Sequence, residues 1–233
     1  MNPLTGVFGE AWRIYRAHVA HLAAIALVVY AVVVAISILL TLLLGWLGFI
    51  LGVIISLAGA FWLQGALIQA VSDVRDGRRD LSVRETFEAV LPRLNRIVLA
   101  GLLLGLAVGV GFLLLVVPGL ILMTIWLLVI PAIVLEDRGI GDAFGRSREL
   151  VRGHGWQVFG VIVLTVLLFL GLGIVLAVLL SPLEDWLADL IGDLVTNVLI
   201  GPYVAAVWTL VYYRLRGEEE PALEPAAPAT PAA

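Results

Sequence analysis

The chain has 233 residues, of which 62% are hydrophobic, and its mean hydropathy is +1.10. A soluble domain of this length could not bury so much apolar surface, so we expect the lipid bilayer to be its solvent. The formal net charge is −4, and the absence of cysteine excludes disulfides, thiolate metal sites and thiol catalysis.

The apolar stretches predict six membrane-spanning helices, because a span needs about 20 apolar residues to cross a hydrocarbon core about 30 Å thick. Glycine, tryptophan and proline mark the turns between neighbouring spans. The spans come from residues 22–71 with a turn at 45–48, residues 97–135 with a turn at 117–119, residues 158–180 and residues 194–213.

All basic residues are arginines, and they lie beside the same ends of the predicted spans. The turns at the other ends hold none. Because basic loops stay in the cytoplasm, this asymmetry predicts an even number of crossings with both termini cytoplasmic. Arginine without lysine is associated with high-GC bacterial genomes, so we expect a multi-pass protein of the bacterial plasma membrane.

An amphipathic pattern recurs three times, each time before an odd-numbered span. Four residues at spacing +4, +7 and +11 share one helix face, and an acid follows two residues after the first. Ser147 is the weakest apolar member. The three faces are Phe8, Trp12, Tyr15 and Val19; Val83, Phe87, Val90 and Leu94; and Ile140, Phe144, Ser147 and Val151.

These patterns predict an all-α polytopic fold built from three repeats of an interfacial amphipathic helix and a transmembrane hairpin. The repeats cover about residues 7–72, 82–135 and 139–214 of a membrane domain at 1–216. The remainder, residues 217–233, is rich in proline, alanine and glutamate and is expected to be a disordered cytoplasmic tail.

Two helix starts are predicted from capping residues. Ser82 with Glu85 makes a capping box ahead of the second amphipathic pattern. Ser181, followed by Pro182 and Glu184, indicates a further helix on the outer surface, with a wet acidic face.

The segments Val117-Pro118-Gly119-Leu120, Pro131-Ala132-Ile133-Val134-Leu135-Glu136 and residues 142–153 (Asp-Ala-Phe-Gly-Arg-Ser-Arg-Glu-Leu-Val-Arg-Gly) carry a resemblance. This part of the chain resembles the integral membrane domain attached to some glycerophosphoryl diester phosphodiesterases, and related stand-alone uncharacterised six-helix bacterial proteins. The resemblance implies a fold and a membrane location over about residues 7–216. The phosphodiesterase activity of the fused proteins belongs to a separate soluble barrel that we do not find here, so no catalytic residue is implied.

The arginine clusters are the main candidate binding residues. A guanidinium group can donate two parallel hydrogen bonds to a phosphate, so these side chains could hold the head groups of anionic lipids. The simpler alternative is that they only set the orientation of the protein in the membrane. The candidates are Arg75, Arg78, Arg79, Arg146, Arg148 and Arg152.

Polar groups inside the predicted spans are few. Gln64, Asn197 and Pro202 could line a polar cavity, but interhelical hydrogen bonds and a proline kink explain them more simply. His18, His21 and His154 lie at one membrane face without a sign that they converge, so we predict no metal site.

We therefore hypothesise a non-catalytic membrane protein that interacts with lipids, or acts as a scaffold or accessory for a soluble or membrane partner, through its cytoplasmic surface helices. The alternative is a transporter or flippase-like conduit for a small or lipidic substrate. No catalytic motif, cofactor or nucleic-acid partner is predicted. The spacing of Gly101, Gly105 and Gly109 favours close helix packing, within one chain or in a dimer.

Overall fold

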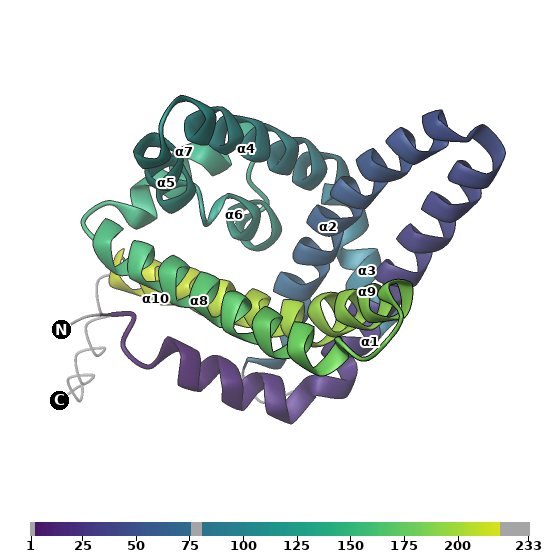
Figure 1. Cartoon of the computed structure of the whole chain (residues 1–233). Helices are drawn as coiled ribbons and strands as arrows, with labels where there is room; N and C mark the ends of the chain where they lie inside the picture. Colours follow the sequence, from purple (N-terminus) through teal and green to yellow (C-terminus); the bar gives the residue numbers. More distant parts are fainter. Residues whose placement is uncertain (1–2, 76–80, 220–233) are drawn as a thin grey trace, which may run out of the picture.

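A computed structural model of the chain describes residues 3–75 and 81–219, and in that part all regular structure is helical (Figure 1). The helices are α1 (Val7–Leu44), α2 (Trp46–Val74), α3 (Val83–Val90), a 3-10 turn (Leu91–Arg93), α4 (Leu94–Leu114), α5 (Val116–Ile125), α6 (Val129–Glu136), α7 (Ile140–Val151), α8 (Gly155–Leu180), α9 (Asp185–Leu194), a π-helical segment (Val195–Ile200) and α10 (Gly201–Glu219).

Six helical segments of the described chain are long and apolar enough to cross a membrane. The protein is therefore an all-α, multi-pass membrane protein, as the apolar stretches predict. We number the segments spans one to six; they are Val7–Leu44, Trp46–Val74, Val83–Leu114, Val116–Glu136, Gly155–Leu180 and Asp185–Gly217.

The core is centred on the second halves of the even-numbered spans, on which the first halves of the odd-numbered spans pack. Val71 of α2, Ile133 of α6 and Val207 of α10 are fully buried, and these three helices contact one another. The second halves of the odd-numbered spans expose large apolar side chains such as Leu113 of α4 and Val178 of α8. Apolar surface of this kind is stable when lipid, rather than water, surrounds it.

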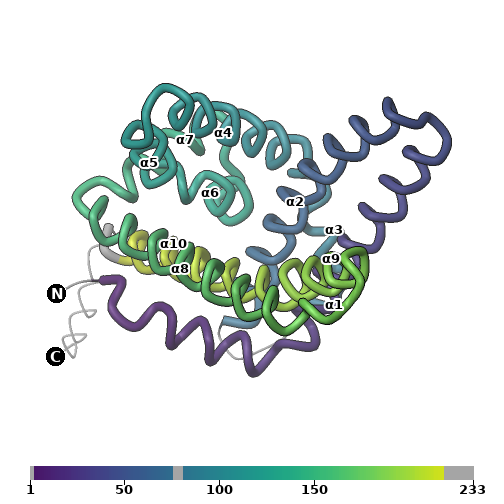
Figure 2. Tube along the Cα trace, in the orientation of Figure 1, coloured from purple at the N-terminus to yellow at the C-terminus, as the bar shows by residue number. Residues whose placement is uncertain are grey.

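The first hairpin turns at Gly45, inside the predicted turn at 45–48. Gly45 has φ 57° and ψ −129°, a conformation that glycine adopts without a steric penalty. The hairpin tip projects away from the other helices, at the upper right of Figure 1 and in the trace of Figure 2. Trp46 at the tip is exposed, as a tryptophan at a membrane–water interface would be.

The second hairpin turns at Leu115, so the turn predicted at 117–119 is wrong by a few residues. Leu115 is extended (φ −162°, ψ 149°), and α5 starts at Val116. Pro118 is the third residue of α5, where no intrahelical N–H bond is lost. Gly119 allows close packing, because a Cβ atom there would lie 2.6 Å from the Phe112 ring.

Span four is interrupted between α5 and α6. Residues 126–128 form a turn between the two helices, with Trp126 at φ −108°, ψ 13° and Leu128 at φ −98°, ψ 12°. The fully buried Ser147 of α7 fills the gap: its hydroxyl donates to Ile125 O (2.7 Å) and accepts from Leu128 N (3.1 Å). Ser147 interrupts the apolar face of α7 because it is the hydrogen-bond partner of this break.

The first amphipathic pattern is not a separate helix in the structure. It forms the start of α1, which continues to Leu44 through a kink at His18 (φ −127°, ψ 21°). The buried face only partly matches the predicted one: Tyr15 of the pattern is buried together with Val7, Ala11 and Ile14, whereas Trp12 is 52% exposed. A side chain that faces lipid satisfies the same apolar pattern as one that faces the protein, so sequence periodicity does not separate them.

Span six differs from prediction at both ends. Its helix starts at Asp185, with Glu184 rather than Ser181 at the N-cap position, and Ser181 instead donates to Val178 O (2.9 Å) at the end of α8. At the other end α10 continues through Gly217 to Glu219, so the tail does not begin at residue 217. Residues 220–233 of the predicted tail lie outside the described residues.

The capping box predicted at Ser82 and Glu85 is confirmed. The Ser82 hydroxyl accepts from Glu85 N (3.3 Å), and the Glu85 carboxylate accepts from Ser82 N (2.7 Å). These two bonds satisfy N–H groups that the first turn of α3 would otherwise leave unpaired.

Candidate functional site

We use the name arginine face for the end of the bundle that holds Arg75, Arg96, Arg146, Arg152 and Arg214. It comprises the ends of α2, α6 and α10 and the start of α4, together with α3 and α7. The chain returns to this end after each hairpin, which is why sequence-distant arginines gather there.

A largely buried ionic cluster surrounds Glu136 at the end of α6. Its side chain is only 10% exposed, and Arg146 of α7 donates from Nε to both carboxylate oxygens at 3.1 Å. Arg138 donates to Oε2 at 3.0 Å, and the buried Tyr212 hydroxyl of α10 donates to Oε1. The four donated bonds compensate for the loss of water around the carboxylate, and they join spans four and six to α7.

Asp137, the next residue, holds the start of α4. It adopts φ 55°, and its carboxylate accepts from Arg93 Nε (2.8 Å) and Arg96 Nη2 (2.7 Å). These bonds, from Arg93 first and then Arg96, lower the pKa of Asp137. Because the group is exposed to water, its main effect is to position Arg93 and Arg96 rather than to add much stability.

The ends of spans two and six are joined at Tyr213. Its hydroxyl lies 2.6 Å from Ser72 Oγ, and the guanidinium of Arg75 stacks on its ring, 3.8 Å from the centroid. The neighbouring Arg214 donates to Pro3 O (3.0 Å) and pairs with Glu10. The start of α1 is therefore fastened to the end of α10.

The structure gives the predicted arginines different environments. Arg146 points inward to Glu136, and its side chain is 17% exposed. Arg75 stacks on Tyr213. Arg148 and Arg152 are exposed, and neither forms an ion pair with an acid of the described chain. Arg78 and Arg79 lie outside the described residues.

Each amphipathic pattern contributes an aromatic ring that packs on an even-numbered span. Phe87 of α3 packs against Trp62 of span two, with ring centroids 5.6 Å apart. Phe144 of α7 packs in the same way against Trp126 of span four, at 5.1 Å. In the first pattern, Trp12 packs against Tyr203 of span six at 6.0 Å. All three rings occupy the second position of their pattern.

The predicted polar-cavity residues have structural contacts. Asn197 donates from its side-chain amide to Asp193 O (2.9 Å) in its own helix. Pro202 is buried in the first turn of α10, directly after the π-helical segment, and the helix continues through it. Gln64 is half-buried on α2.

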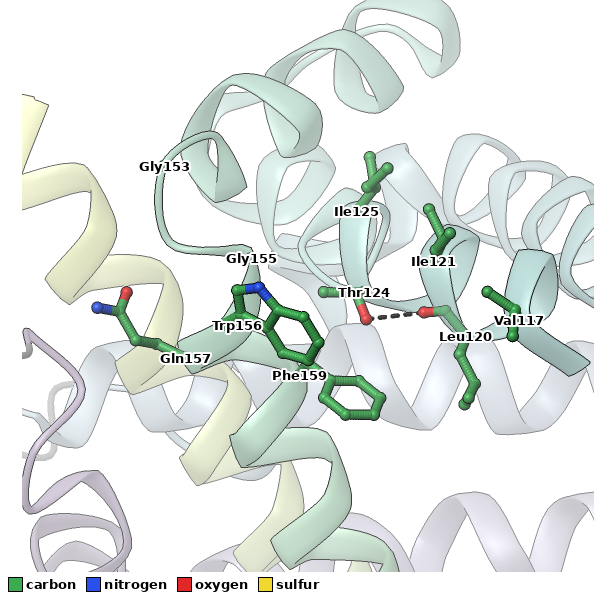
Figure 3. Close-up of a pocket in the computed structure, with 10 residues that line it drawn as sticks. All are labelled: Val117, Leu120, Ile121, Thr124, Ile125, Gly153, Gly155, Trp156, Gln157 and Phe159. Atoms are coloured by element: carbon green, nitrogen blue, oxygen red, sulfur yellow. Dashed lines mark hydrogen bonds between the residues drawn. The ribbon is translucent and has the colours of Figure 1, made fainter.

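An open groove of about 760 Å³ lies elsewhere, between α5 and the start of α8 (Figure 3). Trp156 and Phe159 of α8 lie on the side of Thr124 of α5, whereas the Gln157 side chain points the other way. Sequence reasoning did not identify this groove, because its walls come from segments about thirty residues apart. Trp156, 85% exposed, was the nearest sequence signal.

The histidines lie in different environments. His18 Nδ1 lies 3.2 Å from Ile14 O at the kink of α1, and His21 is buried. Across residues 3–75 and 81–219, no group of three or more potential ligands is arranged to hold a metal ion.

The comparison with known proteins places the chain in a family. No curated protein and no solved structure matches it. Residues 47–215, from the start of α2 to the end of α10, match the family described as a domain of unknown function, DUF7847. The resemblance to the membrane domain of glycerophosphoryl diester phosphodiesterases stays a prediction. Because the match covers well over half of its length, the chain belongs to the DUF7847 family.

Proposed function

We propose that this is a non-catalytic protein of the bacterial plasma membrane that binds anionic lipids at its arginine face, with that face in the cytoplasm. The observation that carries the proposal is the contrast between arginines of one short segment. Arg146 is committed to Glu136, whereas Arg148 and Arg152 are exposed without an acidic partner in the described chain.

Exposed arginines at a membrane interface lie at the depth of the lipid phosphates. Each basic side chain near an anionic surface contributes about 1 kcal/mol of attraction, and a guanidinium adds two parallel hydrogen bonds to a phosphate. Arg13 and Arg16 on the first part of α1 are exposed as well. Acids of the protein, such as Glu136, Asp137 and Glu10, already pair with other arginines, so fewer arginines are available to bind lipid.

We also propose that the three repeats surround a pseudo-threefold axis. Each amphipathic helix packs its aromatic ring on the second span of the preceding unit, and the first helix packs on the last unit, which closes the cycle. The mutual contact of α2, α6 and α10 supports the same arrangement, since one helix from each unit lies at the centre.

Native mass spectrometry with bound lipid tests the function. The natural chain should retain phosphatidylglycerol in preference to phosphatidylcholine, and the double variant Arg148→Ala/Arg152→Ala should lose that preference. Arg84→Ala is the control, because Arg84 is exposed but paired with Glu88 at 2.7 Å. Equal retention of the two lipids by the natural chain would refute lipid selectivity.

The orientation has its own test, because the chain has no cysteine. Ser181→Cys and Gly141→Cys place single thiols at exposed positions on opposite ends of the bundle. A membrane-impermeant maleimide applied to intact cells should label the first variant and not the second. Labelling of Gly141→Cys would place the arginine face outside the cell and overturn the proposed orientation.

A further inference from the structure

The groove between α5 and α8 has walls suited to a hydrocarbon chain. Val117, Leu120 and Ile121 of α5 line one side, and Trp156 and Phe159 of α8 line the other. Thr124 contributes the hydroxyl on this wall, and it already donates to Leu120 O at 2.7 Å, as the dashed line in Figure 3 shows. The polar group on the α5 wall is therefore satisfied within the protein.

The dimensions fit one acyl chain rather than a whole lipid. The volume of about 760 Å³ lies within the range of about 300–1,000 Å³ typical of clefts that hold small ligands. From Val117 to Ile125 the α5 wall is about 12 Å long, at 1.5 Å of rise per residue, which is less than half of a hydrocarbon core. An open apolar groove between spans is filled by the surrounding lipid, because water there would be unfavourable.

The head-group end of the groove is fixed by chain connectivity. Gly153 and Gly155 line this end, and Arg152 directly precedes Gly153, so their Cα atoms are about 3.8 Å apart. Arg148 lies one helical turn before Arg152 and is exposed like it. Trp156 marks the same level, since an exposed indole prefers the membrane–water interface.

We infer that this groove is a binding site for an anionic phospholipid, with one acyl chain between α5 and α8 and the phosphate on Arg148 and Arg152. The inference rests on the proposed function and gives it a defined site. A negative head group complements the two guanidinium groups, and the apolar walls receive the chain that the head group carries.

Variants that fill the groove test the acyl-chain site separately from the phosphate site on the arginines. Ile121→Trp places an indole in the groove at a position that is 50% exposed, and Val117→Trp does so one turn away as an independent second variant. Ile174→Trp is the matched control, because Ile174 is also an exposed isoleucine but lies farther along α8, outside the groove. Each purified full-length variant is compared with the natural chain for retention of phosphatidylglycerol and phosphatidylcholine.

The expected result is a loss of about tenfold in phosphatidylglycerol retention for both groove-filling variants, and no change for the control. If only Arg148→Ala/Arg152→Ala loses selectivity, the groove assignment is overturned and the proposed function stands. If neither the arginine variant nor the groove variants change lipid retention, both the groove assignment and the proposed function are overturned. Loss of both lipids to an equal extent on filling the groove would overturn the assignment of an anionic ligand.

Discussion

Replacing Ser147 by alanine tests how the interrupted fourth span is held together. The hydroxyl of this fully buried residue is the bridge between Ile125 O and Leu128 N. Alanine removes one small polar atom and creates almost no cavity, so packing changes little. It leaves a backbone carbonyl and a backbone N–H without their side-chain partner, in a place that water does not reach.

The cost follows from those two unpaired groups. Each buried polar group left unsatisfied costs about 1–3 kcal/mol, so the variant should lose about 2–4 kcal/mol after local relaxation. At about 2–4 °C per kcal/mol for a chain of this size, the thermal midpoint in detergent micelles should fall by roughly 5–15 °C. Intrinsic tryptophan fluorescence suits the measurement, since Trp126 lies in the break.

Thr209→Val provides a matched control. Thr209 is also fully buried, but its hydroxyl donates to Ala205 O in its own helix (2.7 Å), a carbonyl that belongs to the regular helical hydrogen-bond pattern. Valine keeps the shape, so this variant should change the midpoint by only a few degrees. If Ser147→Ala were as stable as Thr209→Val, the hydroxyl would not be the element that supports the break.

Three other outcomes are expected in the same assay. Glu136→Gln should destabilise by up to about 3–5 kcal/mol, because it removes the carboxylate that pairs with the largely buried Arg146, whose other acidic neighbour, Glu149, is exposed and lies 3.6 Å away; a cost below that of the exposed Arg84→Ala would contradict the assigned geometry. Gly111→Ala should lower the midpoint, because its Cβ would lie 2.9 Å from the Gly119 backbone. Gly105→Ala should leave the midpoint unchanged, because a Cβ atom added there would have no other atom within 4 Å. Equal effects of the two glycine variants would count against close packing in the second hairpin. The pKa of Asp137 is lowered, so its contribution is present above the ordinary aspartate pKa and is lost as the pH falls through the lower, folded value. The difference between the natural chain and Asp137→Asn should therefore vanish in acid, and a difference that grew on acidification would refute the sign.

Features that depend on local chemistry were predictable from the sequence. The apolar length of each stretch determined the six spans, and the turn at Gly45 and the capping box of Ser82 depend on a few adjacent residues. Prediction from neighbouring residues fails where one residue type is compatible with two local structures. Pro118 is compatible with a turn and equally with the first turn of a helix, and the structure has the second.

Features that depend on packing between distant segments were not predictable. Arg146 and Arg148 are two residues apart and chemically identical, so only the position of Glu136 beneath α7 determines which one points inward. In the sequence, Ser147 is only a polar residue within an apolar pattern. Its role is visible in the structure, where its hydroxyl forms hydrogen bonds at the break in span four. The groove was not predictable either, because its two walls come together only in the folded bundle.

The contact between the beginning of α1 and the end of α10 has a consequence for biogenesis. Glu10 and Arg214 are 204 residues apart in sequence, and Trp12 packs on Tyr203 as well as on its neighbour Tyr15. While the ribosome is still translating, α1 can pack on α2, but the contacts of its first turns with α10 form only when the last hydrophobic segment enters the bilayer. Assembly of this protein is therefore completed at the end of synthesis: a chain that stops before span six keeps the packing of α1 on α2 but lacks the contacts between the start of α1 and α10.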